Sequence, residues 1–195
     1  DYASGLTHSL RRGACWVTSN PCKIQLFKKD FPDYYQELIA EIKRENAGAT
    51  PAVMAAQMFT KVCAISARAL YPIFKATNKQ YGFVCMQVDP RDIKDADAMI
   101  KQVEFWYDAM KKELGVEEPN VVFKLPAVEA ALEAARILLE KNYKLCMTMN
   151  ITVPQHLRFA EILSKGKKNG YLVLMGDQLD DQIAKELEAK GVENA

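Results

Sequence analysis

The sequence predicts an α/β fold in which the strands of a parallel sheet alternate with helices. Three observations lead to this prediction: short apolar runs recur along the chain, an amphipathic helical stretch follows each of them, and neither a repeat nor a low-complexity linker interrupts the series. The 195 residues suffice for one sizeable domain with its own core, so we expect residues 1–195 to form a single domain.

The first half of the chain supplies two strands and three helical stretches. Residues 14–21 (ACWVTSNP) are typical of a strand that ends in a turn, and residues 31–46 follow as a helix because their apolar side chains recur at helical spacing. Residues 51–79, rich in Ala and Met, predict a second helix before a strand at 82–90. Residues 95–115 predict a helix with an aspartate at its start and a glycine at its end.

The second half repeats the alternation three times, with strands at 120–126, 144–152 and 171–177 and helices at 127–142, 153–166 and 178–191. Two arrangements fit this pattern, an open doubly wound sheet and a closed (β/α)₈ barrel. No GxGxxG or GxxxxGK[ST] motif follows a strand, so the nucleotide-binding forms of the open sheet lack support. A barrel needs eight strands, so a chain with these five would form part of one, or belong to a longer protein.

Composition excludes several classes of partner. The 26 Lys and Arg residues nearly balance the 25 Asp and Glu residues, which gives no reason to expect nucleic acid or an anionic membrane as partner. No apolar run approaches the ~20 residues of a membrane helix, and the first residues lack the pattern of a secretory signal. The five cysteines have no zinc-ligand spacing, and Cys15, Cys85 and Cys146 fall in apolar runs, as free thiols of a cytoplasmic protein do.

Polar residues stand at the carboxyl ends of the predicted strands, where parallel α/β folds bind ligands. They are Thr18, Ser19, Asn20, Gln87, Asp89, Lys124, Thr148, Asn150, Gly176 and Asp177. Lys124 is the unusual one, because it ends the apolar run Val121–Phe123. A lysine that is desolvated there has a lowered pKa and can attack a carbonyl to form a Schiff base. The alternative is a lysine that reaches from the strand end into solvent.

Two stretches resemble the transaldolase family, to which the small fructose-6-phosphate aldolases also belong. WVTSNP (16–21) resembles the family's [GA]-[VT]-T-T-N-P strand end, and the stretch from VFKLP to TVPQ resembles its Lys strand, helix and Thr strand. Thr148 lies 24 positions and Gln155 31 positions after Lys124, offsets that fit the family. The resemblance runs from about residue 14 to residue 160 and favours the catalytic interpretation of Lys124.

The resemblance implies a (β/α)₈ barrel of the class I aldolase type, of which this chain would cover five to six strands, with no metal or other cofactor. Lys124 would form the Schiff base with a ketose phosphate donor. Asp1 would be the acid/base that takes the proton from the C4 hydroxyl group, and Thr18 and Asn20 would bind substrate hydroxyl groups. The alternatives are an exposed terminal aspartate and an Asn-Pro turn that only shapes the backbone.

Four further positions compare with the family's site. Gln87 falls where transaldolases have Glu and the small aldolases Gln, and with Thr148 it would position the water of Schiff-base formation and hydrolysis. Cys146 replaces the usual Asn in the substrate site. Gln178 stands near the place of the phosphate-binding Arg, among acidic residues, and the basic run 164–170 precedes the last strand and so lies at its other end. The loss of one charge-assisted contact of ~1.5–3 kcal/mol weakens phosphate binding roughly 10- to 150-fold.

Two more departures follow the lysine strand, where Val128 and Ala131 replace a Thr and a Gly of the family. The sequence therefore leaves three functions open: a transaldolase-like enzyme of the pentose phosphate type that acts on a small sugar phosphate, a catalytically inactive barrel with a binding or assembly role, and a Schiff-base aldolase for an unphosphorylated substrate. It also leaves open whether the chain forms a homo-oligomer.

Overall fold

The structure is a computed structural model that describes residues 3–168 and 170–192, except for the side chains of residues 3, 4 and 177–179. Within these ranges the strands are β1 (Trp16–Thr18), β2 (Phe83–Gln87), β3 (Val121–Pro126), β4 (Leu145–Asn150) and β5 (Tyr171–Leu174). The α-helices are α1 (Ala3–Arg11), α2 (Ile24–Asp30), α3 (Pro32–Glu45), α4 (Pro51–Ala76), α5 (Ala96–Leu114), α6 (Glu129–Glu140), α7 (Val153–Leu163) and α8 (Gly176–Ala189). Short 3-10 turns are η1 (Pro21–Lys23) and η2 (Pro90–Asp92).

The strands form one sheet in the order of the sequence, β1-β2-β3-β4-β5. β1 pairs with β2 in parallel, with Thr18 opposite Cys85, and β4 pairs with β5 in parallel, with Cys146 opposite Tyr171. A doubly wound sheet reverses its strand order at a switch point, whereas a (β/α)₈ barrel adds each strand beside the previous one. The described chain is therefore a partial barrel, as the resemblance implied.

The chain falls into two compact units. Unit 1 comprises Asp1–Asp89 and Lys101–Phe123, and unit 2 comprises Pro90–Ile100 and Lys124–Ala195. The boundary passes through β3, so that Val121, Val122 and Phe123 belong to unit 1, whereas Lys124 begins the part of β3 that belongs to unit 2.

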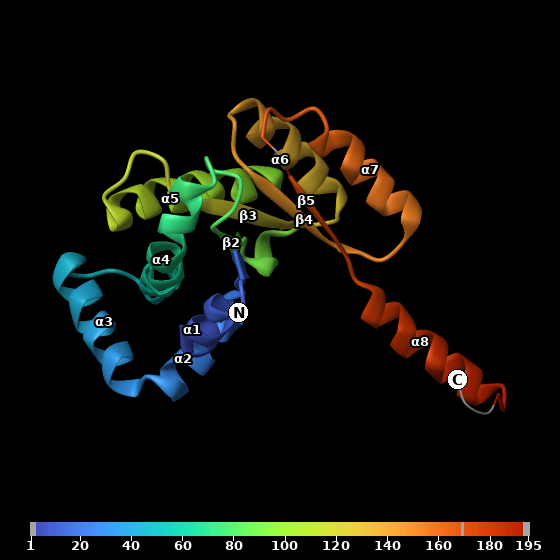
Figure 1. The fold of residues 1–195 in the computed structure, drawn as a ribbon, viewed down its shortest axis with the longest axis horizontal. Coiled ribbons are helices and arrows are strands. Elements are labelled where there is room, and N and C mark those ends of the chain that lie inside the picture. Colours follow the sequence, from blue (N-terminus) through green and yellow to red (C-terminus); the bar gives the residue numbers. More distant parts are fainter. Residues whose placement is uncertain (1–2, 169, 193–195) are drawn as a thin grey trace. The chain divides into compact units, whose positions relative to one another are not determined.

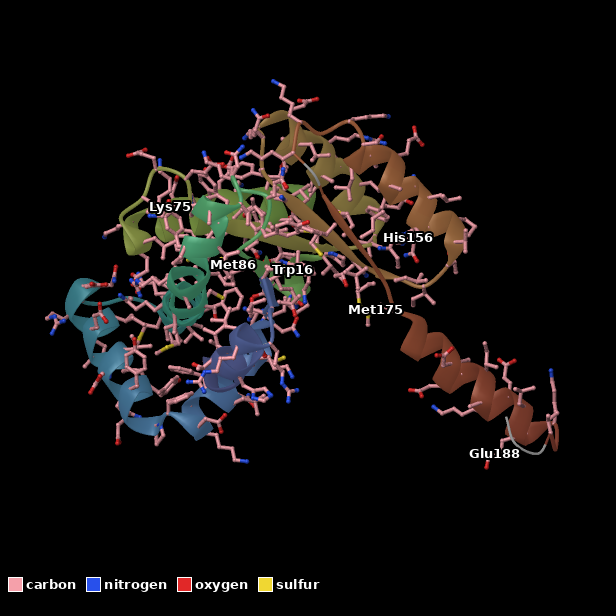
Figure 2. All side chains as sticks on the ribbon, viewed as in Figure 1. Trp16, Lys75, Met86, His156, Met175 and Glu188 are labelled. Atoms are coloured by element: carbon pink, nitrogen blue, oxygen red, sulfur yellow. The ribbon has the colours of Figure 1, made fainter. Side chains whose placement is uncertain are left out.

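In unit 1, the helices α2, α3 and α4 pack around an apolar core (Figure 1). The buried residues of this core are Phe27, Leu38, Ile42, Met58 and Val62. On the neighbouring part of α4, the Phe59 ring lies 5.4 Å from that of Trp106 on α5, in an edge-on arrangement. The paired strands β1 and β2, which carry Trp16 and Met86 (Figure 2), continue the core, and Met86 is fully buried.

Two residues fix the entry into β2 and β3 of unit 1. Gly82 has φ +86°, and a Cβ atom there would lie 2.5 Å from the backbone nitrogen of Phe74, so no other residue fits. The buried amide of Asn120 donates hydrogen bonds to the carbonyl oxygens of Ala67 (2.9 Å) and Gly82 (2.6 Å). Together they hold the amino-terminal ends of these strands against the end of α4.

In unit 2, helices α6 and α7 pack side by side, and α7 also packs against β4 and β5 (Figure 1). α6 contributes the buried residues Ala131, Leu132, Ala134, Ala135, Leu138 and Leu139, and α7 contributes Phe159, Ile162 and Leu163. Asp95 begins the predicted helix that becomes α5, since its carboxylate accepts a hydrogen bond from the Ala98 amide at 2.9 Å. This confirms the aspartate cap that the sequence predicted.

The structure differs from the sequence-based expectations at several element boundaries. The strand predicted for 14–21 is limited to Trp16–Thr18, and the helices α1 and α2 were not predicted. Cys85 and Cys146 are buried as expected, but Cys15 is half-buried, and Cys63 on α4 is a further buried thiol. Among the described residues, no helix is both long and apolar enough to cross a bilayer.

Candidate functional site

Lys124 interrupts a run of buried residues in β3. Its neighbours Phe123 and Leu125 are 1% and 0% exposed, whereas Lys124 itself is half-buried. Successive strand residues point to opposite faces, so Lys124 lies on the face opposite to these two side chains. This agrees with the expectation that Phe123 points away from the face that carries the lysine.

Thr148 and Cys146 lie on β4, the strand next to β3 in the sheet. Both belong to unit 2, as Lys124 does, so this unit brings together three of the predicted site residues on neighbouring strands. Thr148 is half-buried and Cys146 is fully buried. Residues two positions apart share a face in a regular strand, which led to the expectation that Cys146 and Thr148 do so, but β4 is irregular from Thr148 onward.

β4 contains a β-bulge directly at Thr148, which the sequence did not predict. Met147 pairs with Leu172 and Asn150 pairs with Leu174, so Thr148 and Met149 together face the single residue Val173. Met149 has φ +63°, the left-handed region that a non-glycine residue adopts at a cost of about 1–3 kcal/mol. Bulges of this kind redirect side chains and occur next to functional sites.

Asn150 holds the bulge in place. Its side-chain nitrogen donates hydrogen bonds to the carbonyl oxygens of Met147 (3.0 Å) and Val173 (3.2 Å). The backbone amide of Met175 donates to the Asn150 carbonyl at 2.8 Å, which resumes the strand pairing beyond the bulge. Asn150 is 0% exposed, so its amide serves as an internal connector between β4 and β5. In the sequence, this role of Asn150 is indicated only by the position of an amide residue directly after residues 145–149.

Gln155 connects the two loops that follow β3 and β4. Its side-chain nitrogen donates to the carbonyl oxygen of Ala127 at 2.8 Å, and its side-chain oxygen accepts from the amide of Ile151 at 2.9 Å. Both polar ends of the side chain are therefore engaged with backbone groups. Gln155 holds the segments directly beyond Lys124 and Thr148, and its hydrogen bonds assign it a positioning role.

The two departures after the lysine strand have structural consequences. Val128 stands at the N-cap of α6 with extended backbone and makes no side-chain capping hydrogen bond. A threonine, the family residue, could accept such a bond there. Ala131 in the first turn of α6 is 0% exposed, and its methyl group belongs to the core.

In unit 1, three predicted residues lie at the ends of the paired strands β1 and β2. Thr18 ends β1 and Gln87 ends β2, and both are half-buried. Asn20 precedes the turn η1 in extended conformation, and its side chain makes no capping hydrogen bond to that turn. The backbone amide of Lys23 donates to the Asn20 carbonyl at 2.9 Å, so backbone atoms and Pro21 shape the turn.

Ser19 lies between these residues and has a structural role. Its hydroxyl group and its backbone amide both donate to the Cys85 carbonyl, at 2.7 and 2.9 Å. The thiol of Cys63 donates to the Ser19 hydroxyl oxygen at 3.5 Å. Burial raises the pKa of the Cys63 thiol to about 12, although the hydrogen bond to Ser19 lowers it. This thiol is therefore protonated at neutral pH and is no nucleophile.

Two predicted residues are outside what the structure describes. Asp1 lies outside the described residues, and Gln178 lies within α8 but among the side chains that are not described. Over the described part of the chain, no three His, Cys, Asp or Glu side chains gather in a way that could hold a metal ion.

Comparisons with known proteins agree with this arrangement. The family model for Transaldolase/Fructose-6-phosphate aldolase matches residues 8–195. A transaldolase of Neisseria gonorrhoeae is 26% identical over 168 residues, which cover 83% of this chain and 43% of that protein. A transaldolase of Mycobacterium leprae is 30% identical over 143 residues (72% of this chain, 35% of that protein), and transaldolase 2 of a Nostoc species is 28% identical over 153 (75% and 36%). The chain thus spans less than half the length of these relatives. Because the family model matches nearly the whole chain, the protein belongs to the transaldolase/fructose-6-phosphate aldolase family.

Proposed function

We propose that Lys124 is the Schiff-base lysine of a transaldolase-like enzyme that takes a dihydroxyacetone unit from a ketose phosphate. The observation that carries the proposal is the half-buried position of Lys124 between two fully buried residues, on the strand beside that of Thr148. A lysine amine attacks a ketone in its neutral form, and a position away from bulk water suits that step.

In the proposed reaction the Lys124 amine adds to the ketone and the carbinolamine loses water to give an iminium ion. Asp1 removes the proton from the C4 hydroxyl group, the bond between C3 and C4 breaks, and its electron pair neutralises the iminium to an enamine. An aldehyde leaves, and the enamine either attacks an acceptor aldehyde or is protonated and hydrolysed. Transfer and cleavage thus share every step up to the enamine.

The remaining roles follow the family resemblance. Thr148 and Gln87 position the water that is lost and regained, because neither side chain exchanges a proton at neutral pH. Thr18 and Asn20 bind substrate hydroxyl groups from the end of β1 and the turn that follows it. Cys146 and Gln178 line the substrate, and the amide of Gln178 in place of the family's Arg weakens the binding of phosphate.

The test is trapping of the iminium ion by borohydride in the presence of fructose 6-phosphate. Mass spectrometry should find the reduced adduct on the peptide that contains Lys124. Lys124→Ala should abolish the adduct, and the matched control Lys94→Ala, at an exposed lysine of the same unit, should retain it. An adduct on another lysine in the wild-type protein would contradict the proposal.

The departures at Cys146 and Gln178 favour a second candidate, a catalytically inactive barrel with a binding or assembly role. A folded protein that forms no adduct with several ketoses and aldehydes would support this candidate against the first. The third candidate is an aldolase for unphosphorylated donors, which the acidic residues near Gln178 favour. Trapping with dihydroxyacetone but not with dihydroxyacetone phosphate would support it.

A further inference from the structure

A hollow on unit 2 combines cationic side chains with an apolar floor. It lies between the ends of α6 and α7, which pack side by side (Figure 1), and has a volume of about 490 Å³. Its lining residues are Arg136, Leu139, Glu140, Ile162, Lys165 and Lys167. The volume falls in the range of roughly 300–1,000 Å³ that small-molecule sites occupy.

The loop between α7 and β5 is held against α6 by a glycine. A Cβ atom on Gly166 would lie 2.7 Å from a methyl group of Leu139 and 3.3 Å from the Leu163 carbonyl oxygen. Glycine leaves room for the Leu139 side chain at this close approach, and the loop places Lys165 and Lys167 at the hollow. These two lysines are thus fixed at their backbones by the packing of the residue between them.

Two more lysines continue the positive region at the amino-terminal ends of β4 and β5. The ammonium group of Lys144 lies 5.2 Å from the centre of the Tyr171 ring, and the side chain is half-buried. Burial lowers the pKa of Lys144, and the positive charge of Lys168 lowers it further. Lys168 follows Lys167 in the sequence, so this repulsion operates next to the hollow.

Among the described residues, the acidic side chains at the hollow compensate the charges of Arg136, Lys165 and Lys167 only in part. Glu140 lines the hollow, and Glu161 lies 3.4 Å from Lys165 in a pair whose side chains are 68% and 72% exposed. Such exposed pairs contribute about 0–1 kcal/mol and exchange readily with other ions.

We propose that this hollow binds a phosphorylated small molecule that carries a flat ring. The ring would lie on Leu139 and Ile162, and the phosphate groups would meet Arg136, Lys165 and Lys167. The site lies at the amino-terminal ends of the strands, whereas Lys124 and Thr148 lie toward their carboxyl ends, so it is separate from the proposed active site and does not depend on it. It also lies apart from the position of the family's phosphate-binding Arg.

Titration calorimetry of the complete chain with ADP, pyrophosphate and adenosine at 150 mM salt tests the proposal. ADP should bind more tightly than pyrophosphate, and adenosine should not bind measurably. Arg136→Gln and Lys167→Gln should each weaken ADP binding about two- to fivefold, the effect of one exposed charge pair, and Glu140→Gln should strengthen it by a similar factor. Lys43→Gln and Lys101→Gln, exposed lysines of unit 1, are the matched controls and should leave it unchanged.

Three results would overturn the site: no ADP binding at millimolar concentration, equal weakening by the control variants, or unchanged binding in both Arg136→Gln and Lys167→Gln. Equal affinity for ADP and pyrophosphate would overturn the contact between the ring and the apolar floor. Thermal melts of each variant establish that a loss of binding is not a loss of folding.

Discussion

The side-chain nitrogen of Asn150 donates a hydrogen bond to the carbonyl oxygen of Met147 at 3.0 Å, across the two residues that bulge from β4. A bulge removes strand-pairing partners from the backbone groups around it. The same side-chain nitrogen donates a second hydrogen bond to the carbonyl oxygen of Val173 at 3.2 Å. Two carbonyl oxygens lie at one end of the amide, so that end is the NH₂ group. The amide thus replaces the pairing that the bulge interrupts.

Asn150→Ala should therefore destabilise the protein by about 2–4 kcal/mol, because it removes two buried hydrogen bonds. Urea unfolding followed by circular dichroism measures the loss. Asn150→Asp has the same shape but a carboxylate that faces two carbonyl oxygens, so burial should raise its pKa in the folded state. Its stability should fall as pH rises from 4 to 7. A loss below about 0.5 kcal/mol in Asn150→Ala would contradict the role of the side chain.

Met149 offers a test of the strain in the bulge. Its φ of +63° disfavours every residue with a Cβ atom, and its side chain is 49% exposed and has little packing to lose. Met149→Gly should be more stable than Met149→Ala by about 1 kcal/mol, because only glycine adopts this conformation without strain. Paired urea titrations measure the difference. If Met149→Ala is the more stable variant, the residue is not left-handed in solution.

Gln155→Ala should loosen both loops that Gln155 connects. The change removes the bonds to Ala127 and Ile151, and we expect a loss of about 1–3 kcal/mol. Hydrogen exchange gives the local measure, since the Ile151 amide should exchange faster in the variant. The amides of α4 in unit 1 serve as the internal control. Unchanged protection of Ile151 would show that the amide finds its acceptor elsewhere.

Val128→Thr should stabilise the N-terminus of α6. The residue has the extended conformation of a helix N-cap but no side-chain acceptor, and a hydroxyl oxygen there could accept from a backbone amide of the first turn. We expect a gain of about 0.5–1 kcal/mol, measured by thermal unfolding. Val128→Ala is the matched control, because it also removes the valine without adding an acceptor. Equal stability of the two variants would exclude the cap.

Lys61 makes the stability of unit 1 depend on pH in the alkaline range. It is 6% exposed and lies 2.9 Å from Glu41, 3.4 Å from Glu45 and 3.3 Å from Glu113. Burial lowers the pKa of Lys61, but the hydrogen bonds and charges of Glu41 and Glu113 outweigh this effect, and its pKa is raised above the ordinary 10.5. A folded-state pKa above the unfolded one stabilises the protein below pH 10.5, and the contribution is lost as pH rises through the folded value.

Lys61→Met should abolish this contribution, so that its stability falls less between pH 9 and 11 than that of the wild type. At pH 7 it should cost less than Lys61→Ala, for which we expect about 2–4 kcal/mol, because methionine fills the volume and leaves no buried charge. Urea unfolding at each pH measures both effects. A wild-type protein as stable at pH 11 as at pH 9 would contradict the network's contribution.

Much of the fold could be predicted, because the spacing of apolar residues is regular along whole helices and strands. The helix at 51–79 and the strands around Val122, Cys146 and Leu172 carry long apolar patterns, and the structure confirms them. α2 was missed because its seven residues complete fewer than two turns, too few for a periodic pattern, and only Phe27 of them is fully buried in the core, with Ile24 packed against it. That residues 1–195 form a single domain stays a prediction.

The candidate site could be predicted only where it depends on residue type. Lysine in an apolar strand and threonine two strand positions from a cysteine are visible in the sequence, and their position on neighbouring strands follows from the fold. The bulge could not be predicted, because Met149 is a residue type that rarely adopts the left-handed region. The roles of Lys124, Asp1, Gln87 and Thr148 in catalysis stay predictions.

The strand order has a consequence for how the chain folds during its synthesis. Each strand lies beside the strand made immediately before it, so the ribosome releases every pairing partner in the order in which it is needed. Among the described strands, each closure between neighbours spans only the segment between two consecutive strands. We therefore expect nascent chains that end after α7 to protect β1 and β2 from protease as well as the complete chain does.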